Sequence, residues 1–85
     1  DTQRKAINEL IKAIEPFEGM PDSADNAKGL QSKVFDIARN NGIVPKEFFA
    51  LLYQMFLNAE KGPRIGNYFL DLGIDRVISV LKRYV

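Results

Sequence analysis

The chain has 85 residues and a formal net charge of +1, with 46% hydrophobic and 27% charged residues, an ordinary composition for a folded domain. It contains no cysteine and no histidine, which excludes disulfides, thiolate nucleophiles and zinc sites of the usual ligands, and removes the commonest neutral-pH general base. No apolar run is long enough to cross a bilayer, and the near-neutral charge argues against nonspecific nucleic-acid binding by the whole surface.

Two amphipathic helices are expected in the first half of the chain. Apolar residues at spacings of three and four predict one helix over residues 2–14, ending before Pro16, since proline disfavours the helical conformation in the residue before it. A second helix is predicted over about 24–41, with Asp22 or Ser23 as its N-cap.

The end of the second helix has its own sequence pattern. Asn41-Gly42-Ile43 supplies a polar residue, a left-handed glycine and a hydrophobic anchor, which together predict a Schellman-type cap. Gly29, inside the same helix, indicates close packing by a neighbouring element.

A third helix is predicted to begin at Pro45, a residue favoured in the first turn. The following run, residues 48–57, is apolar almost all round, so we expect a central helix that is buried on most sides. Its aromatic residues are expected in the core. Tyr53 is the possible exception, because its hydroxyl needs water or a partner.

The corner after this helix is the most informative stretch. Gly62 is predicted to be the left-handed residue that ends the third helix, and Pro63 to lie in the first turn of the next. Lys61 and Arg64 flank this corner, close to a helix N-terminus that favours an anion such as phosphate. The alternative is a tight helix–helix turn whose charges are simply solvated.

Two short helices complete the chain. The fourth is predicted to end at Gly73, and Asp75 is expected to cap the fifth. The inward-facing residues of the fifth helix are expected to be Val77, Ile78, Leu81 and Tyr84. Residues 61–85 carry a net charge of +3, which places the basic character at the C-terminal end. No segment alternates like a strand, so the predicted fold is all-α, a compact bundle of about five helices forming a single domain over residues 1–85.

The sequence contains no phosphate-binding loop, no dinucleotide fingerprint and no nucleophile–base pair, so we expect a binding domain without catalytic residues, bound metal or cofactor. The residues whose charge or local geometry suits RNA binding are Lys61, Arg64, Asn67, Tyr68, Arg76, Lys82 and Arg83. The outward-facing cations of the fifth helix have an equally plain alternative as a solvated helix end.

A family resemblance rests on three segments: Tyr53-Gln54-Met55-Phe56-Leu57, Glu60-Lys61-Gly62-Pro63-Arg64-Ile65-Gly66 and Leu72-Gly73-Ile74-Asp75-Arg76-Val77-Ile78. They resemble the C-terminal end of class I lysyl-tRNA synthetases. The resemblance covers about the last 40 residues, whereas the first 44 fit only in being helical. Lys61 stands where the family often has arginine, which keeps the charge but loses bidentate geometry.

The resemblance implies that this domain is part of an α-helical cage that receives the tRNA anticodon stem-loop. A separate catalytic domain of the parent chain would activate lysine with ATP, and the fragment alone would catalyse nothing. Since the chain begins at Asp1 without an initiator methionine or a signal-peptide run, we expect a piece cut from the C-terminus of a longer, cytoplasmic synthetase, with no membrane association.

Three alternatives stay open. Glutamyl-tRNA synthetases have a similar helical cage and a similar proline corner. A helical protein-interaction module would suit the near-neutral total charge. Finally, Arg64 could serve internal architecture by pairing with Asp71 or Glu60 and contact no ligand.

Overall fold

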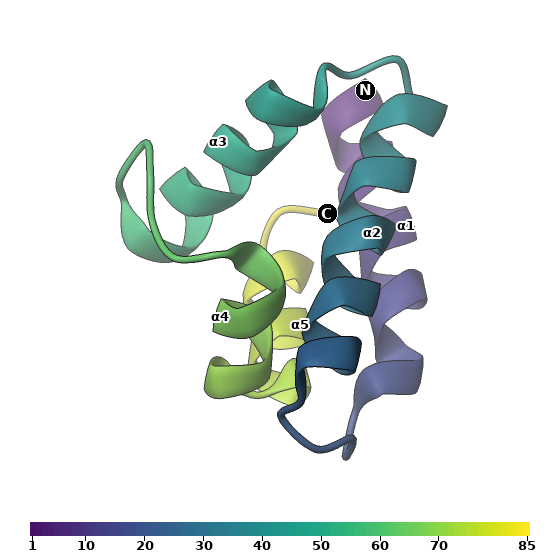
Figure 1. Ribbon diagram of the computed structural model, residues 1–85. Coiled ribbons are helices and arrows are strands. Elements are labelled where there is room, and N and C mark those ends of the chain that lie inside the picture. The colour runs from purple at the N-terminus through teal and green to yellow at the C-terminus, as the bar shows by residue number, and fades with distance from the viewer.

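The computed structural model describes all 85 residues and contains five α-helices and one short 3₁₀ helix, with no strand (Figure 1). The elements are α1 (Thr2–Ile14), η1 (Glu15–Phe17), α2 (Ala24–Asn40), α3 (Pro45–Leu57), α4 (Ile65–Leu72) and α5 (Ile74–Lys82). The predicted all-α bundle of about five helices is therefore confirmed. None of these helices combines the length and the apolar composition that crossing a membrane would require.

The ends of α1 and α2 follow ordinary capping chemistry. The backbone N–H of Arg4 donates to the Asp1 carboxylate at 3.0 Å, and the N–H of Asn26 donates to the Ser23 hydroxyl at 3.2 Å. Ser23, one of the two predicted residues, is therefore the N-cap of α2. Such caps satisfy backbone donors that the helix itself leaves unpaired.

The Schellman cap predicted at the end of α2 is confirmed. Gly42 is left-handed, with φ of +69°, and its N–H donates to the carbonyl of Arg39 at 3.1 Å, while Ile43 N–H donates to the carbonyl of Ala38 at 2.8 Å. The predicted close approach at Gly29 is also present, because a Cβ there would lie 3.2 Å from the ring of Phe17.

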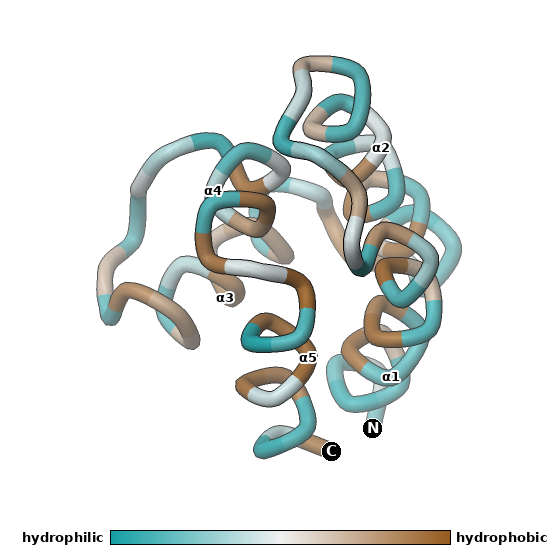
Figure 2. Tube along the Cα trace, turned by 90° about the horizontal axis from the view of Figure 1, so that it is seen from below, coloured by the Kyte–Doolittle hydropathy of each residue, from teal (hydrophilic) through white to brown (hydrophobic).

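The core lies mainly between α1, α2, α4 and α5, which pack on one another. Hydrophobic positions recur along these helices with polar ones between them (Figure 2). The largest fully buried side chains are Phe48, Phe69, Leu10, Ile14, Leu30, Leu52, Ile65, Leu81, Val34 and Val77. Burial of such side chains stabilises the fold by about 1.5–3 kcal/mol each relative to leaving them exposed.

The prediction that α3 is central is wrong. The helix leaves the end of α2 and slants away from the other helices at the edge of the molecule (Figure 1). It packs mainly on α2, and only Phe48 and Leu52 are buried along its length. An apolar run indicates how much surface a helix could bury, but not whether the chain supplies neighbours on every side.

The predictions for the corner at Gly62 and Pro63 are also wrong. α3 ends at Leu57, and the left-handed residue that follows is Asn58, with φ of +52°. Pro63 precedes the first residue of α4 by two positions and lies outside the helix. The link is therefore a loop over residues 58–64 rather than a sharp corner.

Gly62 nevertheless has a structural reason to be glycine. A Cβ at this position would lie 2.6 Å from the Leu57 side chain and 3.1 Å from the ring of Tyr53. The absence of a side chain lets the loop lie close over α3 without displacing Leu57 or Tyr53. Tyr53 finds the partner that its hydroxyl needs, because it donates a hydrogen bond of 2.8 Å to the Pro63 carbonyl.

The last helix differs from prediction at both ends. Gly73 occupies the N-cap position of α5 and no side chain caps it, so Asp75 lies in the first turn instead of capping. Tyr84 follows the end of the helix and is 46% exposed, because the helical spacing that would turn it inward stops at Lys82. Val77 and Leu81 are buried as expected.

Candidate nucleic-acid interface

The start of α4 is held against α2 at Gly66. This glycine is buried, and a Cβ built on it would overlap the carbonyl oxygen of Ala27 and lie 2.9 Å from the carbonyl carbon. Only a residue without a side chain allows the two backbones to approach this closely. The contact fixes the side chains at the start of α4 relative to those on the exposed face of α2.

Gln31 of α2 caps the start of α4. The backbone N–H of Gly66 donates to the Gln31 side-chain oxygen at 3.0 Å. Arg64, the residue in the N-cap position, makes no side-chain cap hydrogen bond. One of the donors that every helix leaves unpaired at its N-terminus is thus satisfied from another helix. The sequence predicted that this helix N-terminus favours an anion. One of its backbone N–H donors, that of Gly66, is instead occupied by Gln31.

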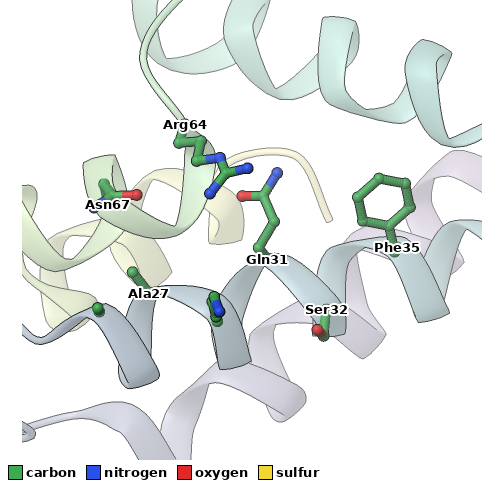
Figure 3. Close-up of a pocket in the computed structure, with 8 residues that line it drawn as sticks. Ala27, Gln31, Ser32, Phe35, Arg64 and Asn67 are labelled. Carbon is green, nitrogen blue, oxygen red and sulfur yellow. The ribbon is translucent and has the colours of Figure 1, made fainter.

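A hollow of about 330 Å³ lies beside this contact, between α2 and the start of α4 (Figure 3). Its lining residues are Ala24, Ala27, Lys28, Gln31, Ser32, Phe35, Arg64 and Asn67. Two of them are cations and none is a carboxylate. The hollow thus offers positive charge and amide groups without a competing negative charge, an arrangement that suits a ligand with an anionic group and hydrogen-bond acceptors.

Two side chains meet at the middle of the hollow. Figure 3 shows the Arg64 guanidinium, at the end of the loop before α4, and the Gln31 amide of α2 reaching toward one another. No carboxylate lines the hollow, so Arg64 makes no ion pair with Asp71 or Glu60 there. Such an ion pair would have given Arg64 a purely architectural role.

Phe35 lies at one end of the hollow (Figure 3). Its ring packs edge-on against Phe49 of α3, with 5.0 Å between centroids. The Arg39 guanidinium carbon lies 5.7 Å from the Phe35 centroid, within the range of a cation–π contact. Phe35 thus lines the hollow and also contacts an arginine that does not line it.

The structure separates most of the residues that the sequence suggested for RNA binding. Arg64 and Asn67 line this hollow together. Lys61 lies four residues before α4 and lines a different hollow, of about 690 Å³, along α3. Tyr68 is half-buried with its ring 6.1 Å from that of Phe56.

The C-terminal cations form a separate surface. Arg76 and Arg83 line a third hollow together with Asp75, so a carboxylate lies among them. Lys82 is exposed and lines none of these hollows. The basic residues of the last 25 positions are therefore not gathered around Arg64.

The α2 side of the hollow was missed from the sequence. Lys28, Gln31 and Phe35 follow one another at spacings of three and four along α2, beside its buried residues; Lys28 is exposed, whereas Gln31 and Phe35 are half-buried. This spacing could have indicated a stripe that combines a cation, an amide and an aromatic ring. What the sequence could not indicate is that this stripe faces Arg64.

Comparison with known proteins gives one consistent relation. Proteins called lysine–tRNA ligase match the chain from Borreliella burgdorferi at 31% identity over all 85 residues, from Thermoplasma volcanium at 36% over 94% of the chain, and from Picrophilus torridus at 32% over 93%. The chain is related to lysine–tRNA ligases. The relation includes the first 44 residues, for which the sequence motifs gave no specific resemblance.

The chain spans about one sixth of the length of these relatives, 16% of the Borreliella protein and 15% of the Thermoplasma protein. No family model matches the chain. No solved structure matches it either. The likeness thus connects this helical bundle to one segment of lysine–tRNA ligases.

Proposed function

We propose that the chain is the tRNA anticodon-binding domain from the C-terminal region of a class I lysyl-tRNA synthetase. The observation that carries the proposal is that lysine–tRNA ligases match 93–100% of the chain, combined with a hollow of two cations, amides and an aromatic ring. In this role the bundle forms part of a helical cage, and the enzyme acts in the cytoplasm.

The chemistry of the hollow suits an unpaired stretch of RNA. Lys28 and Arg64 supply positive charge for phosphate groups. Contacts between such cations and phosphates position the nucleic acid. Splayed bases are recognised by hydrogen bonds to their edges and by contact with aromatic side chains. Gln31 and Asn67 offer hydrogen bonds to base edges, and Phe35 offers an aromatic ring at the same hollow.

Catalysis belongs to another part of the proposed parent enzyme. ATP-dependent activation of lysine and its transfer to tRNA are assigned to a separate catalytic domain outside this chain. The domain described here contributes affinity and selection of the tRNA. Lys61, Tyr68, Arg76, Lys82 and Arg83 remain predicted RNA contacts outside the hollow that Arg64 and Asn67 line.

Fluorescence anisotropy with a labelled lysine-tRNA anticodon stem-loop tests the proposal. The matched controls are the same stem-loop with its anticodon changed and a glutamate-tRNA stem-loop. Affinity that falls steeply with salt, and that is highest for the lysine anticodon, is the expected result, because phosphate contacts release counterions. Tighter binding of the glutamate stem-loop would favour the glutamyl family. Absence of RNA binding by the folded domain would contradict the proposal and favour a protein-interaction module.

A further inference from the structure

We propose that Gln31 has two functions in the hollow: its amide oxygen holds α4 in place, and its amide nitrogen donates to a carbonyl oxygen of one unpaired nucleotide. The phosphate of that nucleotide is proposed to lie between Lys28 and Arg64. This inference rests on the proposed RNA-binding function and adds the residue and the chemical class of base that the site prefers.

The orientation of the Gln31 amide follows from its hydrogen bond. The Gly66 N–H is a donor, so the group that faces it at 3.0 Å must be the amide oxygen. The amide nitrogen is therefore on the side away from α4. Figure 3 shows this arrangement, with the oxygen directed toward α4 and the nitrogen turned away from it.

The nitrogen is left available to a ligand. The side-chain hydrogen bonds of the protein include the one accepted by the Gln31 oxygen and none donated by its nitrogen. Gln31 lines the hollow, so its two N–H groups can reach a bound molecule. Because the amide cannot turn over without losing the cap, it presents donors to the hollow and not an acceptor.

The other polar groups agree with a ligand rich in acceptors. Lys28 and Arg64 carry only donors, Ser32 and Asn67 can donate as well as accept, and no carboxylate lines the hollow. Phosphate oxygens satisfy the two cations, and a base carbonyl satisfies the Gln31 nitrogen. Uracil and guanine carry carbonyl oxygens on their exposed edges, whereas adenine accepts there through ring nitrogens that lie beside its amino donor. The Gln31 oxygen, already engaged by Gly66, cannot accept from that amino group. We therefore expect a preference for a carbonyl-bearing base over adenine.

The size of the hollow suits a small unit of a ligand. Its volume of about 330 Å³ is at the lower end of the range of about 300–1,000 Å³ for sites that hold a small molecule. One nucleotide inserted from a single-stranded loop is consistent with that volume.

The Gln31→Glu variant separates the two functions of this side chain. A glutamate oxygen can still accept from Gly66, and a negative charge is favourable at a helix N-terminus, so the melting temperature should be unchanged or higher. The donor is lost and a negative charge enters the hollow. We expect affinity for the lysine stem-loop to fall by roughly tenfold to a hundredfold, as for loss of a hydrogen bond to a charged or buried partner.

Gln3→Glu, which makes the same change at an exposed position on α1, is the matched control and should alter affinity by less than about threefold, the scale of a distant surface charge. Equal affinity of the Gln31 and Gln3 variants would overturn the inference while leaving the proposed function intact.

A second measurement tests the inference without the stem-loop. The side-chain amide signals of Gln31, Gln3 and Gln54 can be followed by NMR in the ¹⁵N-labelled domain during titration with tri-uridylate or tri-adenylate. A shift of the Gln31 signal that is larger with tri-uridylate, while the other two stay in place, supports the inference. No shift, or equal shifts with the two probes, overturns it. Failure of the domain to bind any stem-loop would instead count against the proposed function, so the two failures are distinguishable.

Discussion

Gly66 of α4 lies so close to Ala27 of α2 that a Cβ on the glycine would overlap the alanine carbonyl oxygen. The same two helices are joined by the hydrogen bond from Gly66 to Gln31. A single backbone approach therefore sets both the packing of α4 and the position of the candidate site, which couples the stability of this part of the fold to its ability to bind.

Gly66→Ala should consequently be strongly destabilising. The new methyl group meets backbone, which cannot move as a flexible side chain can, so we expect a loss of about 1–3 kcal/mol or more in the free energy of unfolding. Gly29→Ala is the matched control, because its Cβ would meet only the Phe17 ring at 3.2 Å, and the gain in helix propensity offsets that contact. Urea denaturation measures both variants, and equal stability of the two would contradict the packing described.

Tyr53→Phe should loosen the loop that leads to Arg64. The Tyr53 hydroxyl donates to the Pro63 carbonyl at 2.8 Å, and loss of such a hydrogen bond costs about 0.5–1.5 kcal/mol. Because the bond is exposed to solvent, we expect a value near the lower end. Tyr84→Phe at an exposed position beyond α5 is the control. The same loss in both variants would show that the Tyr53 bond does not anchor the loop.

Asp22 and Asp71 should give the domain a characteristic pH dependence. A hydrogen bond with the Asp71 side chain, with lesser contributions from desolvation and from repulsion by that carboxylate, raises the pKa of Asp22 above its usual 3.8. Between 3.8 and the raised pKa, the folded state binds more protons than the unfolded state. Stability therefore falls as the pH rises through this window.

The Asp71→Asn variant tests this coupling. Removing the second carboxylate should flatten the pH dependence above 3.8 and raise the melting temperature at neutral pH. Asp36→Asn, a change at an exposed carboxylate of α2, serves as the control. Melting curves that change equally in the two variants would argue against a specific interaction between Asp22 and Asp71.

Arg64→Ala should weaken RNA binding without destabilising the fold. The side chain is exposed and makes no cap hydrogen bond, so the melting temperature should stay close to that of the wild type. Loss of one phosphate contact should lower affinity and reduce the slope of log K against log salt by about one. Lys5→Ala on α1 removes the same charge away from the hollow. A lower melting temperature with unchanged binding would indicate an architectural Arg64.

Most of the secondary structure could be predicted from the sequence, because its signals are local. Ser23 at the N-cap and Gly42 in the Schellman cap each lie within a few residues of the groups they satisfy. The predictions failed where the outcome depends on distant neighbours. The apolar residues of α3 pack against α2 on one side of the helix, and few residues lie against its other sides.

The candidate site was only partly predictable for the same reason. Arg64 and Asn67 belong to one local motif, and both line the hollow. Gln31 lies 35 residues before Gly66 in the sequence, and nothing in either segment indicates that the two meet. Packing between α2 and α4 creates this part of the site.

The most direct test of RNA binding at the hollow is NMR mapping of the backbone amides. The ¹⁵N-labelled domain would be titrated with the unlabelled lysine-tRNA anticodon stem-loop, and the shift of each amide would be compared along the chain. We expect the largest shifts over residues 28–35 and 64–67, which form the two sides of the hollow. Shifts confined to residues 76–83, or none anywhere on the folded domain, would contradict RNA binding between α2 and α4.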